Sequence, residues 1–211
     1  MVRSFWSNCG SHLAARNIVV VDSLLTQLLS TQYSTFLESS NPSSFVWHPV
    51  LSSCIEGTLG DCPDTTMWFK DVHTVYTIMS WGNCHWVGLV IYLQTWHIDI
   101  LDPLLAATTD TEVISYMSPL VNMLPHLIMA TCETRDIEHV DDTNFSYSLL
   151  EPLPQNHNGG DCGPYAQKLI EMHSHGYELK HLSSISASMI EDSRMQYALD
   201  VYKQFVGNVC I

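Results

Sequence analysis

Two adjacent runs rich in β-branched and aromatic residues, Trp86–Leu93 and Trp96–Leu101, constrain the fold more than any other feature of the sequence. Each run is long enough for a strand, and only Gln94 and Thr95 separate them, so together they predict a β-hairpin. Because the turn is so short, the residues that flank it are expected to pair with each other, which predicts the register as well. We therefore expect a sheet built around this hairpin.

The predicted register decides which carboxylate can meet His85, the residue just before the first strand. It places Asp102 opposite Val87, two residues from His85 and on the same face of the sheet. Asp99 falls on the opposite face, roughly 16 Å from His85 along the strand at ~3.3 Å per residue. Asp102 is therefore the predicted partner of His85.

Hydrophobic spacing elsewhere predicts one more strand and several helices. The strand is expected at Val72–Met79, beside the hairpin. The helices are expected at about Asp22–Glu38, Val113–Leu124 and Pro164–His173, followed by a last one with Ala198, Val201, Tyr202 and Phe205 as its core face. Pro119 and Pro125 are expected to bound or kink the second helix, and Gly176 to cap the third. These elements predict an α+β fold with a small mixed or antiparallel sheet flanked by helices.

Length and composition predict a single domain covering residues 1–211, with 46% apolar and 14% charged residues. This composition is far from that of disordered chains. No run approaches the ~18 consecutive apolar residues of a membrane span, and the first residues lack the apolar core of a signal peptide. Seven cysteines without paired spacing are typical of reduced thiols. We expect an intracellular protein of the nucleus or cytoplasm, with no membrane partner.

The charge balance argues against nucleic acid as a partner. The chain has 8 Lys and Arg residues against 22 Asp and Glu residues, which gives a formal net charge of −14. Nucleic-acid affinity is built from clustered Lys and Arg side chains that neutralise phosphates. We therefore expect no nucleic-acid partner.

Cys162 lies in the glycine-rich segment Gly159–Pro164 (GGDCGP), directly before a predicted helix. The thiolate is the reactive form of cysteine, and a helix N-terminus and a neighbouring imidazolium both favour it. Flanking glycines also let a substrate backbone approach closely. The alternative interpretation is an inert buried cysteine in a turn, and Asp161 is as well explained by helix capping as by chemistry.

Other cysteine and histidine pairs predict less. Cys84, next to His85, is expected to be a packed cysteine at the strand edge, with a redox-sensitive thiol as the alternative. Zinc sites usually show tighter spacing such as C-x-x-C, so we expect no metal. The pairs considered for a metal were Cys9 with His12, Cys54 with Cys62, and His173 with His175.

The order of these residues resembles the ubiquitin-like-protein proteases, which process and remove SUMO and related modifiers. That family has His-Trp, then Asp after a hairpin, then Gln shortly before Asp-Cys-Gly. The corresponding residues are His85-Trp86, Asp102 seventeen residues on, Gln155, and Asp161-Cys162-Gly163. The resemblance spans about residues 72–176, and the sequence around Cys162 is most similar to the divergent, plant transposon-associated branch. It implies the cysteine-protease fold shared with the adenovirus protease.

The resemblance also implies roles for these residues. Cys162 is expected to be the nucleophile, His85 the base, and Asp102 the group that orients the imidazole. Gln155 is expected to stabilise the oxyanion together with the backbone N–H of Cys162. A gap-free match instead puts Asn156 at that position, six residues before the nucleophile. No cofactor is implied.

The expected substrate is a ubiquitin-like modifier or its conjugates. In the resembled family, the Trp after the catalytic His covers a narrow tunnel for the terminal Gly-Gly, which implies substrate contacts for Trp86, Gly163 and Asn156. The implied activity is that of a cysteine peptidase or isopeptidase. A catalytically silent modifier-binding module and an acyltransferase on the same fold remain the alternatives.

Overall fold

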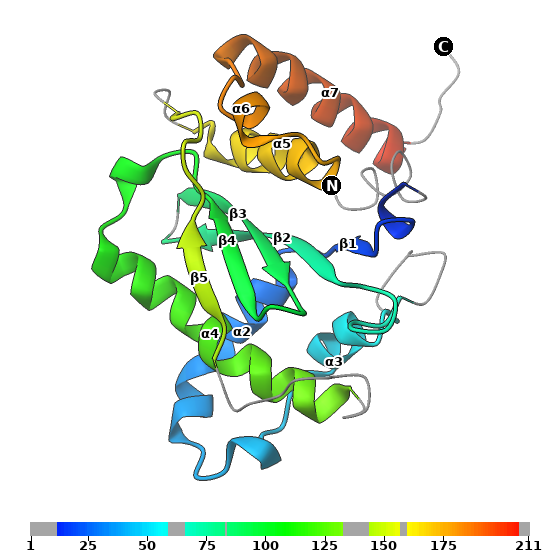
Figure 1. Cartoon of the computed structure of the whole chain (residues 1–211), viewed down its shortest axis with the longest axis vertical. Coiled ribbons are helices and arrows are strands. Elements are labelled where there is room, and N and C mark those ends of the chain that lie inside the picture. Colours follow the sequence, from blue (N-terminus) through cyan, green and yellow to red (C-terminus); the bar gives the residue numbers. More distant parts are fainter. Residues whose placement is uncertain (1–11, 59–65, 83, 133–143, 157–159, 207–211) are drawn as a thin grey trace.

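The computed structural model describes residues 12–58, 66–82, 84–132, 144–156 and 160–206. The strands form a central layer with helices on both sides (Figure 1). The strands are β1 (Ile18–Val20), β2 (Thr74–Trp81), β3 (His85–Tyr92), β4 (His97–Leu101) and β5 (Ser146–Leu149). The α-helices are α2 (Leu24–Glu38), α3 (Pro49–Ile55), α4 (Asp110–Thr131), α5 (Cys162–Ser174), α6 (Leu179–Leu182) and α7 (Ala187–Val206), and the 3-10 helices are η1 (Pro42–Ser44) and η2 (Leu105–Ala107).

The five strands form one mixed sheet in the order β1-β2-β3-β4-β5. The three central strands are antiparallel, and the short edge strands β1 and β5 run parallel to their neighbours. The hairpin is present with the predicted register, because Val90 pairs with Asp99 and Gly88 with Leu101. The α+β fold class with a mixed sheet is therefore confirmed.

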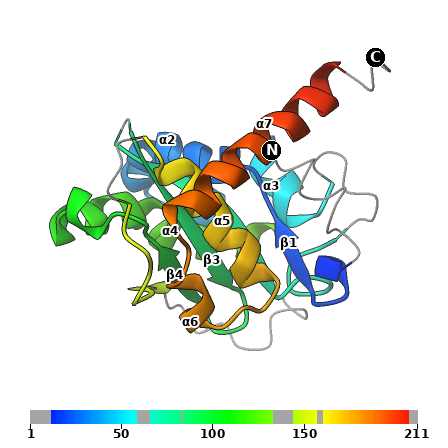
Figure 2. The ribbon, with the colours of Figure 1, turned by 90° about the horizontal axis from the view of Figure 1, so that it is seen from above.

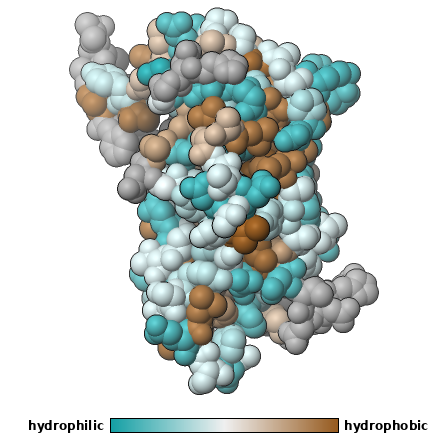
Figure 3. All heavy atoms as spheres, turned by 90° about the vertical axis from the view of Figure 1, so that its left-hand side faces the viewer, coloured by the Kyte–Doolittle hydropathy of each residue, from teal (hydrophilic) through white to brown (hydrophobic). Residues whose placement is uncertain are grey.

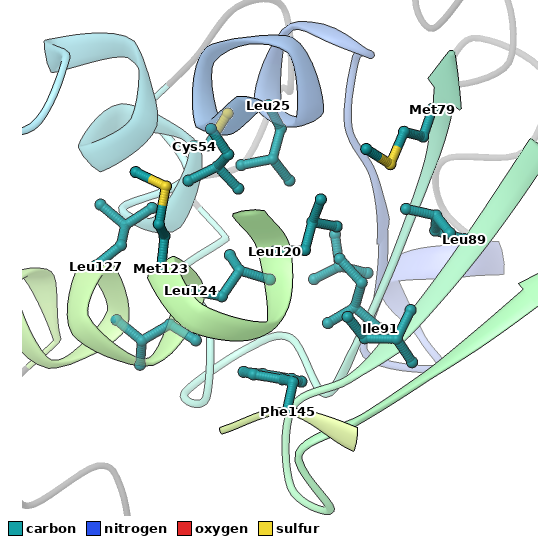
Figure 4. Close-up of a cluster of buried hydrophobic side chains, with 14 of the residues drawn as sticks. Leu25, Cys54, Met79, Leu89, Ile91, Leu120, Met123, Leu124, Leu127 and Phe145 are labelled. Carbon is teal, nitrogen blue, oxygen red and sulfur yellow. The ribbon is translucent and has the colours of Figure 1, made fainter. Parts of the chain in front are cut away.

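One face of the sheet packs against α2, α3 and α4 and forms the larger core (Figure 4). Alternate residues of β2 and β3, such as Met79, Leu89 and Ile91, meet Leu120 and Leu124 of α4 in this layer. This alternation is the period-two pattern of a strand with one face against a helix layer. The core holds the sheet end on which His85 lies.

The other face of the sheet is covered by α5, with α6 and α7 stacked outside it (Figure 1). The helix approaches β3 closely at Gly88, where a Cβ would lie 3.0 Å from Cγ1 of Ile170 and 3.3 Å from Cβ of Leu101. The absence of a side chain at Gly88 thus sets the depth at which α5 packs. Gly176 follows α5 with φ +81°, and its N–H donates to His173 O at 2.9 Å, so the predicted glycine cap is confirmed.

Helix α4 runs through both prolines instead of ending or breaking at them. A proline inside a helix costs roughly 3 kcal/mol, whereas full burial of a Leu or Met side chain stabilises by roughly 1.5–3 kcal/mol. The buried apolar residues of α4 outnumber its two prolines and include Met117, Leu120, Met123, Leu124, Leu127 and Ile128. Its length and composition also suit a membrane span, but half of the apolar window is buried within the fold, as in the core helix of a globular protein.

The predicted core face of the last helix is wrong. Ala198, Val201 and Tyr202 are exposed in α7, and the side chain of Phe205 lies outside the described part of the chain. The helix instead packs through Ile190, which is 1% exposed, and through the half-buried Tyr197. Seen from above, the C-terminal half of α7 extends past the rest of the molecule (Figure 2). The apolar residues in this half of α7 therefore have the spacing of a buried helix face, although they are exposed.

The surface is not uniform in polarity. On the face shown in Figure 3, hydrophobic residues gather mainly in the upper half, which in Figure 1 holds α5, α6 and α7. The lower half of that face is mostly polar, with smaller hydrophobic groups.

Candidate active site

His85 and Asp102 form a buried hydrogen-bonded pair at one end of the sheet. Nε2 of His85 lies 2.8 Å from Oδ1 of Asp102, and the two residues are 6% and 1% exposed. The same carboxylate oxygen accepts the backbone N–H of Leu104 at 2.7 Å. Since a carboxylate only accepts, His85 donates through Nε2, which leaves Nδ1 as the basic ring atom.

Nδ1 of His85 is buried and has no hydrogen-bond partner among the described residues. Buried polar atoms are rarely left in this state, so such an atom calls for an explanation. The ring is held from the side by Trp81, whose ring lies 6.0 Å away in an edge-on arrangement. Trp81 is itself stacked on Tyr116 of α4 at 5.6 Å. The imidazole is thus fixed by a carboxylate and an aromatic pair, with one nitrogen unused.

Cys162 is the first residue of α5 and contacts the residue that precedes His85. The Sγ atom donates to the carbonyl oxygen of Cys84, the residue before His85, at 3.3 Å. On the other side, a Cβ built on Gly163 would lie 3.8 Å from Cδ1 of Trp86, the residue after His85. The residues on both sides of His85 therefore lie close to the first turn of α5.

The local sequence explains why the thiol stands at this end of the helix. Gly160 has φ +88°, a backbone conformation that glycine adopts without strain. The chain then enters α5 at Cys162, with Pro164 within the first turn, where its missing N–H costs no helical bond. The thiol is thus buried at a helix N-terminus, with a residue exposure of 6%.

The two candidate oxyanion amides differ in their surroundings. Oε1 of Gln155 accepts the N–H of Leu105 at 2.8 Å, and its Nε2 donates to Leu153 O at 3.3 Å. Asn156 is 3% exposed, and its backbone N–H donates to Pro103 O at 2.6 Å. Both residues thus tie their loop to the segment that follows Asp102, and the amide of Gln155 is engaged with backbone on both sides.

Two interpretations of single residues change with the structure. Cys84 is exposed, so the expectation of a packed cysteine is wrong: it lies between β2 and β3 with its side chain exposed and its carbonyl oxygen accepting from Cys162. Asp161 is the N-cap residue of α5, but its side chain makes no capping bond. Sequence reasoning also missed Trp81 and Tyr116, although an aromatic residue four positions before His85 is a visible signal.

In the part of the chain that the structure describes, no group of three or more His, Cys, Asp or Glu side chains is arranged to hold a metal ion. Cys9 and Cys62, which belong to two of the pairs considered from sequence, lie outside the described residues. His173 and His175 point to different partners, Tyr76 and His12.

A sheet-and-helix fold with a cysteine at a helix N-terminus beside a His–Asp pair defines a cysteine peptidase fold. The family model of the Ulp1 protease family, C-terminal catalytic domain, matches residues 1–209. The chain therefore belongs to this family. Among curated protein sequences, none matches the chain significantly.

Solved structures with the same fold are only distantly similar in sequence. The SUMO protease Ulp1 with its catalytic cysteine oxidised to a sulfenic acid is 16% identical, with a TM-score of 0.57 and coverage of 91% of this chain and 73% of that one. Ulp1 in complex with Smt3, the yeast ortholog of SUMO, is 14% identical, with a TM-score of 0.52 and coverage of 90% and 69%. XopD of Xanthomonas campestris bound to ubiquitin is 15% identical, with a TM-score of 0.50 and coverage of 92% and 87%. The chain spans 65% of a further Ulp1 structure.

Proposed function

We propose that this chain is a cysteine peptidase or isopeptidase that cleaves after the C-terminal Gly-Gly of a SUMO-like modifier, with Cys162, His85 and Asp102 as its triad. One observation carries the proposal. The buried His85–Asp102 pair leaves Nδ1 of His85 without a partner in the described part of the chain, beside the helix N-terminus that bears Cys162. A nucleophile next to a base that is itself oriented by a third group is the arrangement that covalent catalysis requires.

In the proposed reaction, Nδ1 of His85 takes the proton of Cys162, and the thiolate attacks the carbonyl carbon after the Gly-Gly terminus. Asp102 keeps the other ring nitrogen protonated and stabilises the imidazolium. When the tetrahedral intermediate collapses, the C–N bond breaks and the amine leaves with the proton from His85. Water then attacks the thioester and releases the modifier and the free thiol. No cofactor takes part.

The oxyanion of the intermediate needs donors that are already in place. We assign this role to the backbone N–H of Cys162 and to the amide of Asn156. The two backbone bonds of the Gln155 amide support a different role for that residue, which is to fix the loop that carries Asn156. This assignment replaces Gln155, the residue favoured by the sequence order alone.

The substrate side of the proposal rests on Trp86 and Gly163. Trp86 lies close to the first turn of α5, where a Cβ added at Gly163 would be 3.8 Å from its Cδ1, and this closeness supports a narrow passage beside Cys162 that suits residues without a β-carbon. The solved structures of Ulp1 with Smt3 and of XopD with ubiquitin support a ubiquitin-like protein as the partner. SUMO-like and ubiquitin-like termini therefore both belong in the test.

The experiment uses ubiquitin-like proteins that carry an electrophile in place of the C-terminal carboxylate. The full chain is incubated with a panel that includes SUMO, NEDD8 and ubiquitin probes, and covalent adducts are detected by intact mass. We expect one adduct per chain, attached at Cys162 and absent in Cys162→Ala. A silent binding module gives no adduct, and a label on another cysteine contradicts the triad. An acyltransferase forms the adduct but, with a cleavable precursor, passes the acyl group to an added amine instead of to water.

A further inference from the structure

Asp161, directly before Cys162, is held by a residue from a different helix. Nη1 of Arg194 in α7 lies 2.6 Å from Oδ1 of Asp161. The side chain of Asp161 is only 13% exposed, whereas that of Arg194 is 57% exposed. Asp161 makes no side-chain capping bond to its own helix, and its carboxylate instead forms this ion pair with Arg194.

The contact belongs to a defined interface between α7 and α5. Ile190 is buried in the smaller core, and the hydroxyl of Tyr197 donates to Oε2 of Glu171 at 3.1 Å. Asp161 and Glu171 lie at opposite ends of α5, about 15 Å apart at 1.5 Å per residue. Arg194 and Tyr197 are one turn apart, so a single turn of α7 contacts α5 near both of its ends.

The position of Asp161 creates an electrostatic problem for the nucleophile. A carboxylate next to a thiol opposes formation of the thiolate, because like charges repel in a partly desolvated site. Two features favour the thiolate, namely the helix N-terminus and the nearby His85. A guanidinium on the carboxylate removes most of the opposing charge without any contact to the sulfur.

We propose that Arg194 is a positioning residue of this site, which neutralises Asp161 and thereby favours the thiolate of Cys162. The proposal rests on the proposed function only in taking Cys162 as the nucleophile. It gives α7, which lies outside the motif-bearing part of the sequence, a direct part in the reactivity of the thiol. It also gives Asp161 a reason to be there that is not helix capping.

The test measures the alkylation rate of Cys162 by iodoacetamide at neutral pH, resolved by peptide mass spectrometry so that Cys84 is read separately. With the charge of Asp161 uncompensated, Arg194→Gln is expected to slow alkylation of Cys162 about 3- to 10-fold. The double variant Arg194→Gln/Asp161→Asn is expected to return to within about twofold of the wild-type rate, and Arg194→Lys to retain most of it. Lys203→Gln, which removes the same charge from an exposed position of α7, serves as the control and should leave the rate unchanged.

A role in packing alone predicts a different pattern. In that case the double variant stays as slow as Arg194→Gln, and this result overturns the proposal, as does an unchanged rate in Arg194→Gln itself. The slowing should also shrink in ~0.5 M salt, because exposed charges are screened. The assay needs no protein substrate. If the alkylation pattern holds but no ubiquitin-like probe reacts, the proposed function fails and the role of Arg194 stands.

Discussion

His85 and Asp102 meet at 2.8 Å although Asp102 lies just beyond the end of its strand. The N–H of Leu104 fixes the same carboxylate oxygen at 2.7 Å, so the carboxylate cannot turn away from the imidazole without losing a second bond. Both residues are buried. The tautomer of His85 is therefore set by the backbone that follows β4 as well as by the carboxylate itself.

Replacing Asp102 by Asn should lower turnover by about 10² to 10⁴, because the amide can donate to Nε2 and so favours the wrong tautomer of His85. Asp99→Asn is the matched control. Asp99 pairs with Val90 and binds the hydroxyl of Tyr92 at 3.0 Å, away from His85. Steady-state cleavage of a modifier with a fluorogenic C-terminal group measures both variants. A larger loss in Asp99→Asn contradicts the assigned triad.

Alanine variants of the two amide residues, Gln155 and Asn156, should differ in their kinetic constants. If Asn156 donates to the oxyanion, Asn156→Ala should lower kcat about 10²- to 10³-fold with little change in KM. Gln155→Ala should have a smaller effect on kcat, accompanied by a loss of thermal stability, since its amide bridges two backbone groups. The opposite ranking of kcat would return the oxyanion role to Gln155.

The passage beside Cys162 should select termini without side chains. Precursors that end in Gly-Gly should be cleaved at least ~10-fold faster than those that end in Ala-Ala, because specificity for one methyl group in a tight site is worth about 1–3 kcal/mol. Trp86→Ala should lower the ratio of the Gly-Gly rate to the Ala-Ala rate. It should have only a small effect on folding stability, since Trp86 is only half-buried. Equal rates for the two termini would remove the proposed role of Trp86.

Gly88→Ala should destabilise the fold by about 1–3 kcal/mol, the usual cost of overpacking. The added Cβ would lie 3.0 Å from Cγ1 of Ile170, in the layer where α5 meets β3. Gly163→Ala is the control, because its Cβ would meet Trp86 at an ordinary 3.8 Å. Urea unfolding followed by circular dichroism compares the two variants. We expect Gly163→Ala to unfold like the wild type, so an equal loss in both would show that Gly88 does not set the packing depth.

Stability should fall in mild acid because of His173. Burial lowers the pKa of His173 below its usual 6.5, outweighing the opposing effect of Asp99, and its Nδ1 lies 2.7 Å from the hydroxyl of Tyr76. The unfolded chain therefore takes up the proton more readily, so the free energy of unfolding decreases as the pH falls below about 6.5. His173→Gln, which keeps an acceptor for Tyr76, should show a flatter profile between pH 7 and 5. A profile as steep as that of the wild type would mean that His173 does not titrate on unfolding.

The hairpin was predictable because local chemistry determines it. The short turn and the alternating pattern gave the correct register, with Val90 opposite Asp99, and this register selects Asp102 without knowledge of the rest of the fold. The glycine cap at Gly176 was predictable for the same reason. Features that depend on neighbours one to three residues away are accessible to sequence reasoning.

The elements that were missed depend on distant partners. Nothing local to α7 distinguishes Ile190, which is buried, from Val201, which is exposed: the difference is that the C-terminal part of α7 extends past the rest of the molecule. Strand β1 is only three residues long and is defined by its pairing with β2. The ion pair of Arg194 with Asp161 joins residues 33 positions apart, and no local sequence pattern predicts it. Tertiary packing decides such cases.

The site is assembled from one local piece and one remote piece. Seventeen positions separate His85 from Asp102 within a single hairpin, whereas 78 separate Cys84 from Cys162. Closing a short loop is fast and costs little entropy, so the imidazole and its carboxylate can meet early in folding. The thiol joins them only through the packing of α5 onto β3, which is close at Gly88. The arrangement proposed for catalysis therefore depends on the complete tertiary fold and not on the hairpin alone.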